Sequence, residues 1–148
     1  MQRVMKLGVA ICVAALGACG GASDSSGPGP DPGLYADYVL TSVNGDPLPA
    51  LIDQSASSHT FIHSADIRLS ANLTFSDMRS STLTDATGDH PSTVTRTGTF
   101  TVSGSTVTLV YQDAFGNGTA GNDVALSGRV MTKSETTNQV TNTYAFTR

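Results

Sequence analysis

The chain has 148 residues, with eight Lys and Arg against twelve Asp and Glu, three His, two Cys and no Trp. This length predicts one folded domain, and a formal net charge of −4 with scattered basic residues argues against a nucleic-acid binder. Two cysteines are too few for a disulfide-rich scaffold or a four-cysteine zinc site.

Residues 1–18 are expected to form a secretory signal peptide. Arg3 and Lys6 precede an apolar run over residues 7–16, and the small residues Gly17 and Ala18 follow it. The apolar run is about ten residues long, whereas a helix needs ~20 to span a bilayer. We therefore expect this segment to direct export and to be removed from the mature protein.

The boundary after residue 18 resembles a bacterial lipobox. Residues 16–19 read Leu-Gly-Ala-Cys, and in such a motif the cysteine thiol receives a diacylglyceryl group before cleavage. The resemblance implies that Cys19 is the lipidated first residue of the mature chain; the alternative is an ordinary signal with a chance cysteine at its end. Gly20 in place of an Asp favours, by the same resemblance, the outer membrane over the inner one. We expect a membrane attachment through the lipid on Cys19.

Residues 19–33 are expected to link the lipidated cysteine to the folded domain. From residue 20 to residue 33 the chain contains no aliphatic side chain larger than Ala and is rich in Gly, Ser and Pro. Such a segment buries too little apolar surface to offset its ordering entropy, which predicts a flexible tether. Removal of Arg3 and Lys6 with the signal leaves six basic residues of the eight against twelve acidic ones, so the lipid must supply the membrane attachment.

Residues 34–148 have the composition and periodicity of an all-β domain. Thr is abundant, and apolar residues alternate with Thr and Ser, which is typical of antiparallel strands with one buried face. Strands are expected near 36–43, 59–69, 72–82, 93–102, 106–112, 119–126, 129–135 and 140–147, because turn residues separate these runs. About eight sequential strands predict an up-and-down meander that closes into a barrel, with a two-sheet sandwich as the alternative.

Two longer connections interrupt the series of expected strands. Residues 44–58 contain Pro47, Pro49 and a short apolar patch at 50–52 that could form one helical turn across a barrel end. We interpret the segment as a surface loop held in place by two apolar residues. A mobile lid is the alternative for this segment. Residues 85–92 are polar and are expected to form a solvated loop.

Three segments resemble the small lipocalin-like lipoproteins of bacterial envelopes. They read YVLTSVNGDPLP at 38–49, GTFTVSGSTVTL at 98–109 and YAF at 144–146. Lipocalins have Gly-x-Trp on their first strand, where this chain has Gly-Leu-Tyr at 33–35. In lipocalins an Arg of the last strand packs over that Trp, so the resemblance implies that Arg148 packs against Tyr35 or Tyr38. The candidate lumen residues are apolar or aromatic: Phe61, Phe75, Phe100, Leu109, Tyr111, Tyr144 and Phe146.

Catalytic and metal sites receive little support from the sequence. His59 and His63 have a spacing that suits zinc on a helix, but on the expected strand a separation of four residues is ~13 Å, too far for two ligands of one ion. No Gly-x-Ser-x-Gly elbow is present, and no feature singles out Asp66, Asp77 or Asp113 as one of a catalytic pair of carboxylates. We expect neither enzyme activity nor a cofactor.

Three functional hypotheses remain open. The leading one is a non-enzymatic, monomeric envelope lipoprotein whose barrel binds a small apolar molecule or acts as an interaction surface. The second is a structural or inhibitory module that engages another envelope protein through residues 44–58 or 113–118, and the third is a hydrolase or metal enzyme that uses His59, His63 or His90. An open cavity would favour the first, a lumen filled by side chains the second, and a histidine beside two acidic groups in a cleft the third.

Overall fold

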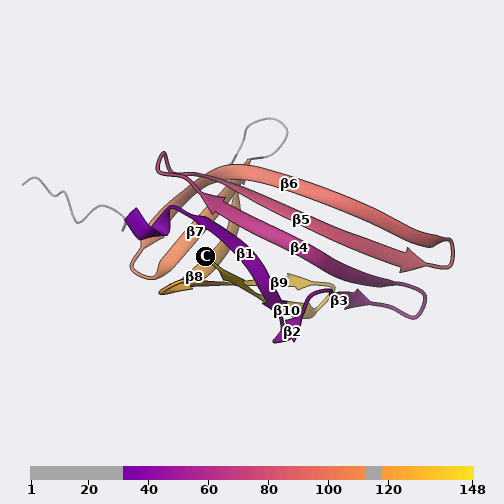
Figure 1. Cartoon of the computed structure of the whole chain (residues 1–148). Helices are drawn as coiled ribbons and strands as arrows, with labels where there is room; N and C mark the ends of the chain where they lie inside the picture. Colours follow the sequence, from indigo (N-terminus) through magenta and orange to yellow (C-terminus); the bar gives the residue numbers. More distant parts are fainter. Residues whose placement is uncertain (1–31, 113–117) are drawn as a thin grey trace, which may run out of the picture.

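Eight antiparallel strands close into a barrel in the computed structural model, which describes residues 32–112 and 118–148 (Figure 1). The elements are the 3-10 turn η1 (Pro32–Leu34), β1 (Asp37–Val43), β2 (Asp46–Pro47), β3 (Ala50–Gln54), β4 (His59–Leu69), β5 (Thr74–Asp85), β6 (Gly88–Ser103), β7 (Thr106–Gln112), β8 (Gly118–Ser127), β9 (Val130–Thr137) and β10 (Val140–Thr147). The ring follows chain order from β4 to β10, and β1 lies between β10 and β4. The short strands β2 and β3 lie outside the ring.

Strand β1 closes the barrel because it pairs along both of its edges. Leu40 lies opposite Phe146 of β10, and Tyr38 lies opposite Ile67 of β4. This double pairing excludes the two-sheet sandwich and confirms the expected barrel. At the β1–β4 seam the exposed Arg68 donates from Nη2 to Oδ2 of Asp37 at 2.9 Å.

The alternation of apolar and polar residues produces the barrel core. In β10 the buried residues Asn142, Tyr144 and Phe146 alternate with the exposed Thr143 and Thr147, because successive side chains of a strand point to opposite faces. Each ring strand contributes such an inward row. The apolar core side chains, each at most 3% exposed, include Tyr38, Leu40, Ile67, Leu69, Phe75, Phe100, Val107, Leu109, Val124, Met131, Tyr144 and Phe146.

Gly98 allows β6 to approach the aromatic part of the core closely. A Cβ at this position would lie 2.0 Å from the carbonyl oxygen of Val110 and 2.8 Å from the ring of Phe75. Gly98 pairs with Phe75 on one side and Tyr111 on the other, and the rings of these two residues meet edge to face with centroids 5.1 Å apart. The absence of a side chain is therefore a packing requirement of the ring.

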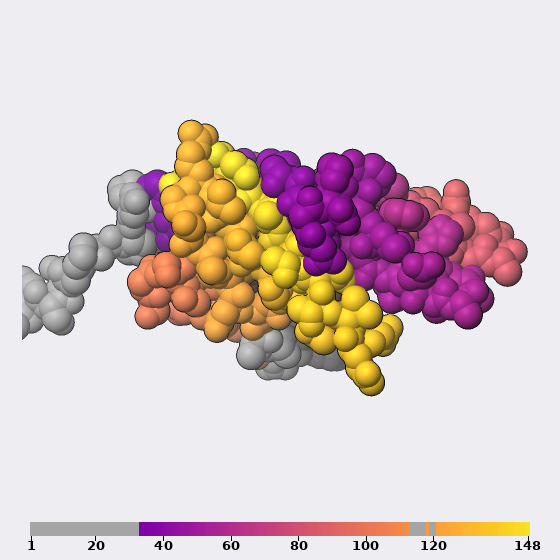
Figure 2. All heavy atoms as spheres, turned by 90° about the horizontal axis from the view of Figure 1, so that it is seen from below, coloured from indigo at the N-terminus to yellow at the C-terminus, as the bar shows by residue number. Residues whose placement is uncertain are grey.

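Strands β4, β5 and β6 continue beyond the ring as a sheet, to which β3 adds a strand beside β4. We call this sheet the extension; it consists of residues 50–65, 78–85 and 88–97. Only residues 98–103 of β6 pair with β7, so residues 88–97 have β5 as a neighbour on one edge and no described strand on the other. Figure 1 shows these strands extending well beyond the ring. Figure 2 shows the same end of the molecule projecting past β8 to β10.

The structure corrects the interpretation of residues 85–92 as a loop. Strands β5 and β6 pair as far as Asp85 and Gly88, so the connection is a tight hairpin turn. Thr84 donates from Oγ1 to Oδ1 of Asp89 at 2.6 Å, and the Thr87 amide donates to Oδ1 of Asp85 at 2.7 Å. Residues 86–97 are all exposed. Because neither face of the hairpin is buried there, the sequence has no apolar alternation to indicate a strand, and the segment was predicted as a loop.

The interpretation of residues 44–58 as a surface loop is also wrong, and the apolar patch at 50–52 forms no helical turn. This segment forms β2, which pairs with β1, and β3, which pairs with β4. Ala50 lies opposite Ile62, and both are buried, so the apolar patch at 50–52 adds an outer strand to β4.

The predicted signal peptide, Cys19 and most of the tether lie outside the described residues, as does the segment 113–117. Within the described ranges no helix is both long and apolar enough to cross a membrane.

Candidate functional site at the open end of the barrel

A lysine lies fully buried among acceptors in the middle of the barrel. The side chain of Lys133, on β9, is 0% exposed, and its Nζ donates to Oδ2 of Asp77 at 2.9 Å. The same Nζ lies 2.8 Å from the Tyr111 hydroxyl and 2.9 Å from Oε1 of Glu135. Because Asp77 belongs to β5, four strands away around the ring of eight, the Lys133–Asp77 pair joins opposite walls of the barrel.

A second ion pair continues the network toward the extension. Arg79 of β5 donates from Nη2 to Oε2 of Glu135 at 2.9 Å, and the side chains of both residues are at least four-fifths buried. The Arg79 guanidinium carbon lies 4.9 Å from the ring centroid of Tyr144, a cation–π distance. Asn122 of β8 also donates to Glu135, at 3.4 Å. Each buried charge is therefore paired.

The ion pairs favour the charged forms of Lys133 and Glu135 and do not activate Lys133 as a nucleophile. Burial by itself lowers the pKa of Lys133, but the carboxylates of Asp77 and Glu135 outweigh burial and raise this pKa to about 12. Burial also raises the pKa of Glu135, whereas Lys133 and Arg79 outweigh it and hold the pKa below the usual 4.5. A nucleophilic lysine needs a lowered pKa, so this arrangement holds fixed charges in place.

The sequence does contain a signal for this network, in charged residues at inward positions of two expected strands. Asp77 and Arg79 share the inward face of β5 with Phe75, and Lys133 and Glu135 share the inward face of β9 with Met131. Charged residues at inward positions of two expected strands indicate that the charges meet inside the barrel. From the sequence, Asp77 was weighed only as a candidate catalytic carboxylate, and its pairing with Lys133 was missed.

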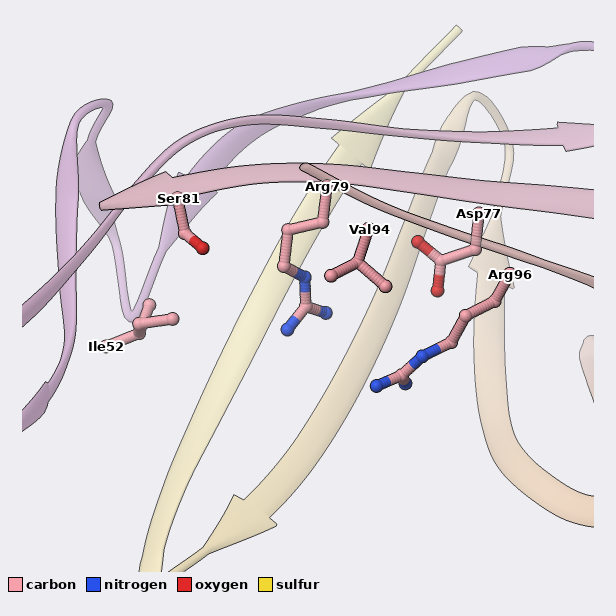
Figure 3. Close-up of a pocket in the computed structure, with 6 residues that line it drawn as sticks. All are labelled: Ile52, Asp77, Arg79, Ser81, Val94 and Arg96. Atoms are coloured by element: carbon pink, nitrogen blue, oxygen red, sulfur yellow. The ribbon is translucent and has the colours of Figure 1, made fainter. Parts of the chain in front are cut away.

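A pocket of about 210 Å³ opens where the ring passes into the extension. Its lining is Ile52, Asp77, Arg79, Ser81, Val94 and Arg96. Figure 3 shows both guanidinium groups pointing to the same side of the β5–β6 sheet, with Val94 between them and Ile52 approaching from β3. The pocket therefore combines cationic, hydroxyl and aliphatic groups above the buried ion pairs.

The structure places most of the candidate lumen residues in a packed core. Five of them are at most 3% exposed and belong to one continuous cluster: Phe75, Phe100, Leu109, Tyr144 and Phe146. Tyr111 packs against that cluster and also enters the polar network. Phe61 lies outside it, next to the buried Ile62 in β4 and therefore on the opposite face. Side chains, rather than an open cavity, occupy this part of the lumen.

The three histidines lie apart from the polar network. The rings of His59 and Phe61 meet edge to face at 5.4 Å, and Nε2 of His63 lies 2.8 Å from Oγ1 of Thr82. Both histidines are on β4, and His90 is near the tip of the β5–β6 hairpin. In the described part of the chain no three His, Cys, Asp or Glu side chains are grouped as a metal site would require.

The contacts of His90 resemble a catalytic triad in composition only. Its Nε2 lies 2.9 Å from Oγ1 of Thr87 and 3.3 Å from Oδ1 of Asp85. A triad histidine uses one ring nitrogen for the hydroxyl and the other for the carboxylate, whereas here one nitrogen serves both. The cluster stabilises the hairpin turn, and these hydrogen bonds, chiefly from Thr87, lower the pKa of Asp85 to about 2.

The other end of the barrel contains the residues suggested by the lipocalin-like resemblance. The guanidinium carbon of Arg148 lies 5.8 Å from the ring centroid of Tyr38, and the Tyr38 hydroxyl donates to the Leu34 carbonyl at 3.2 Å. Tyr35 is half-buried and packs against the core. These contacts fasten η1 over the ring end opposite the β5–β6 hairpin.

Comparison with known proteins gives no family assignment. No family model matches the chain, and neither curated proteins nor solved structures show a significant match to it.

Proposed function

We propose that the chain is a lipid-anchored, non-enzymatic lipoprotein of the bacterial envelope whose β-barrel domain is an interaction module for another envelope protein. One observation carries this proposal: the lumen is filled by core side chains and a paired charge network, while no described strand pairs with the outer edge of residues 88–97. A carrier of apolar molecules would instead need an apolar cavity with an open mouth.

The lipobox resemblance supports the anchoring part of the proposal. Lipid on Cys19 would attach the chain to a membrane, and two or more acyl chains make such attachment durable. By its composition the segment 20–33 would act as a linker, with a root-mean-square reach of about 20 Å. The barrel would then lie close to the membrane surface with its extension accessible to neighbouring proteins.

The extension supports the interaction part of the proposal. An unpaired strand edge exposes backbone N–H and C=O groups that another protein can pair with, and residues 88–97 of β6 present such an edge among the described residues. Val94 and Leu83 are 43% and 39% exposed and lie on one face of the sheet, with Arg79 and His90 as their cross-strand partners. Pro91, within the same edge, lacks an N–H and limits indiscriminate strand pairing.

The anchor is tested by a single substitution. Cys19→Ser in the full chain, expressed in a bacterial host that processes lipoproteins, should abolish incorporation of labelled palmitate and release the protein from membranes. Cys12→Ser is the matched control and should retain both properties. Palmitate incorporation that persists in Cys19→Ser would exclude the anchor.

The interaction surface is tested by photo-crosslinking in intact cells of the source bacterium. A photoactivatable residue at Val94 should give a reproducible adduct of defined mass with one envelope protein. The same residue at Val130 is the matched control, since Val130 is similarly exposed, at 39%, but begins β9 at the other end of the barrel. Equal adducts at both positions, or none at Val94, would contradict the proposed surface.

A further inference from the structure

The pocket at the ring end contains two arginines on the same side of the sheet. Arg96 of β6 lies opposite Asp77 of β5, and Arg79 lies opposite Val94, so all four side chains share one face. Arg96 is held beside the Tyr111 ring, with its guanidinium carbon 5.7 Å from the ring centroid. Both guanidinium groups line the pocket (Figure 3).

The charges around this pocket do not cancel. Lys133 is ion-paired with Asp77 and Glu135, and Arg79 is ion-paired with Glu135. Arg96 takes part in no ion pair with another described residue. Among the described residues, three cationic side chains therefore face two carboxylates, which leaves one positive charge at the pocket in a protein that is acidic overall.

The environment favours an anion at this position. The buried ion pair between Arg79 and Glu135 holds the Arg79 guanidinium in place at the pocket. An Arg guanidinium presents a planar set of donors that matches a carboxylate, and the Ser81 hydroxyl supplies a further donor on the lining. Ile52 and Val94 provide aliphatic walls beside these donors.

We infer that this pocket binds a small organic acid, with its carboxylate between Arg96 and Arg79 and its short aliphatic part against Ile52 and Val94. A carboxylate carries a single negative charge and so balances Arg96, which has no ion-pair partner among the described residues, whereas a phosphate group carries ~1.5 to 2 negative charges near neutral pH. This inference is independent of the protein interaction proposed above.

The test is titration of the isotope-labelled full chain, reconstituted in lipid nanodiscs, with hexanoate. Saturable NMR shifts are expected at residues 52, 79, 81, 94 and 96. The neutral analogue 1-hexanol and inorganic phosphate should produce no saturable shift there at the same concentrations. Shifts centred elsewhere, or equal binding of 1-hexanol or phosphate, would overturn the inference.

Two variants locate the site and one controls for charge. Arg96→Gln should weaken hexanoate binding roughly 10- to 100-fold, the usual effect of losing hydrogen bonds to a charged group. Val94→Phe should block binding by filling the pocket, and each variant should keep the melting temperature of the parent because residues 94 and 96 are exposed. Arg129→Gln removes the same charge at a distant turn and should bind as tightly as the parent; a loss equal to that of Arg96→Gln would show non-specific attraction.

Discussion

The ring and the extension are built from the same strands but are stabilised differently. Within the ring the inward side chains of β5 and β6 are buried, as at Phe75 and Phe100, which are at most 3% exposed. Beyond Gly98 the same two strands run into solvent, and residues 88–97 of β6 are exposed throughout. Residues 88–97 therefore depend on strand pairing, whereas the ring and the part of the extension around Ala50 and Ile62 also have a core.

The largest loss of stability should follow replacement of the buried lysine of the ring. Lys133→Met removes the positive charge that compensates Asp77 and Glu135, so the free energy of unfolding should fall by about 3–5 kcal/mol. Chemical denaturation monitored by circular dichroism measures this loss. A variant as stable as the parent would show that the network contributes nothing to the ring.

Gly98→Ala should be the next most damaging change. The added methyl would overlap the Val110 carbonyl and the Phe75 ring, and such overpacking costs about 1–3 kcal/mol. Thr95→Val, three residues away in the extension, should change the free energy of unfolding by less than about 0.5 kcal/mol. Equal effects of the two substitutions would contradict the distinction between ring and extension.

The ring should lose stability in acid. Because folding holds the pKa of Glu135 below 4.5, its ion pairs contribute stability above that pH, and the contribution is lost as the pH falls below 4.5. Lys133 has a raised pKa, so its contribution is complete below pH 10.5 and disappears only as the pH rises toward about 12. Melting temperatures between pH 3 and pH 7 test the acid limb, and Glu135→Gln should flatten it.

The smallest expected effect is at the end of the ring where η1 packs. The Arg148–Tyr38 contact should be worth about 0.5–1 kcal/mol, the usual value for an accessible cation–π pair. A double-mutant cycle of Arg148→Gln and Tyr38→Leu isolates this pair from the other bonds that Arg148 makes. A coupling energy of zero would show that the two groups are neighbours without interacting.

The difference between the ring and the extension also explains which strands were predicted correctly from the sequence. The bounds expected for the strands at 59–69, 106–112 and 140–147 agree with the structure, because an apolar row alternating with Thr marks a strand with one buried face. The barrel closure that this pattern predicted is also correct. Residues 86–92 were wrongly predicted as a loop because both faces of the hairpin tip are exposed, so apolar and polar residues do not alternate there.

The polar site was harder to predict for a different physical reason. Lys133 and Asp77 are 56 residues apart, and their pairing across the lumen depends on the number of strands and on the register of the ring. Sequence periodicity gives the inward direction of each side chain but not its partner on the opposite wall. Arg96 was missed because its position in β6 is exposed and resembles an ordinary surface arginine.

The proposed role of the extension is tested most directly by hydrogen–deuterium exchange. Exchange of the full chain purified in nanodiscs is compared with its exchange in native envelope membranes. We predict that residues 88–97 exchange more slowly in the native membranes, because a partner covers the edge of β6 that no described strand pairs with, while exchange in the ring strands is unchanged. Identical exchange of residues 88–97 in the two preparations would contradict the proposed interaction surface.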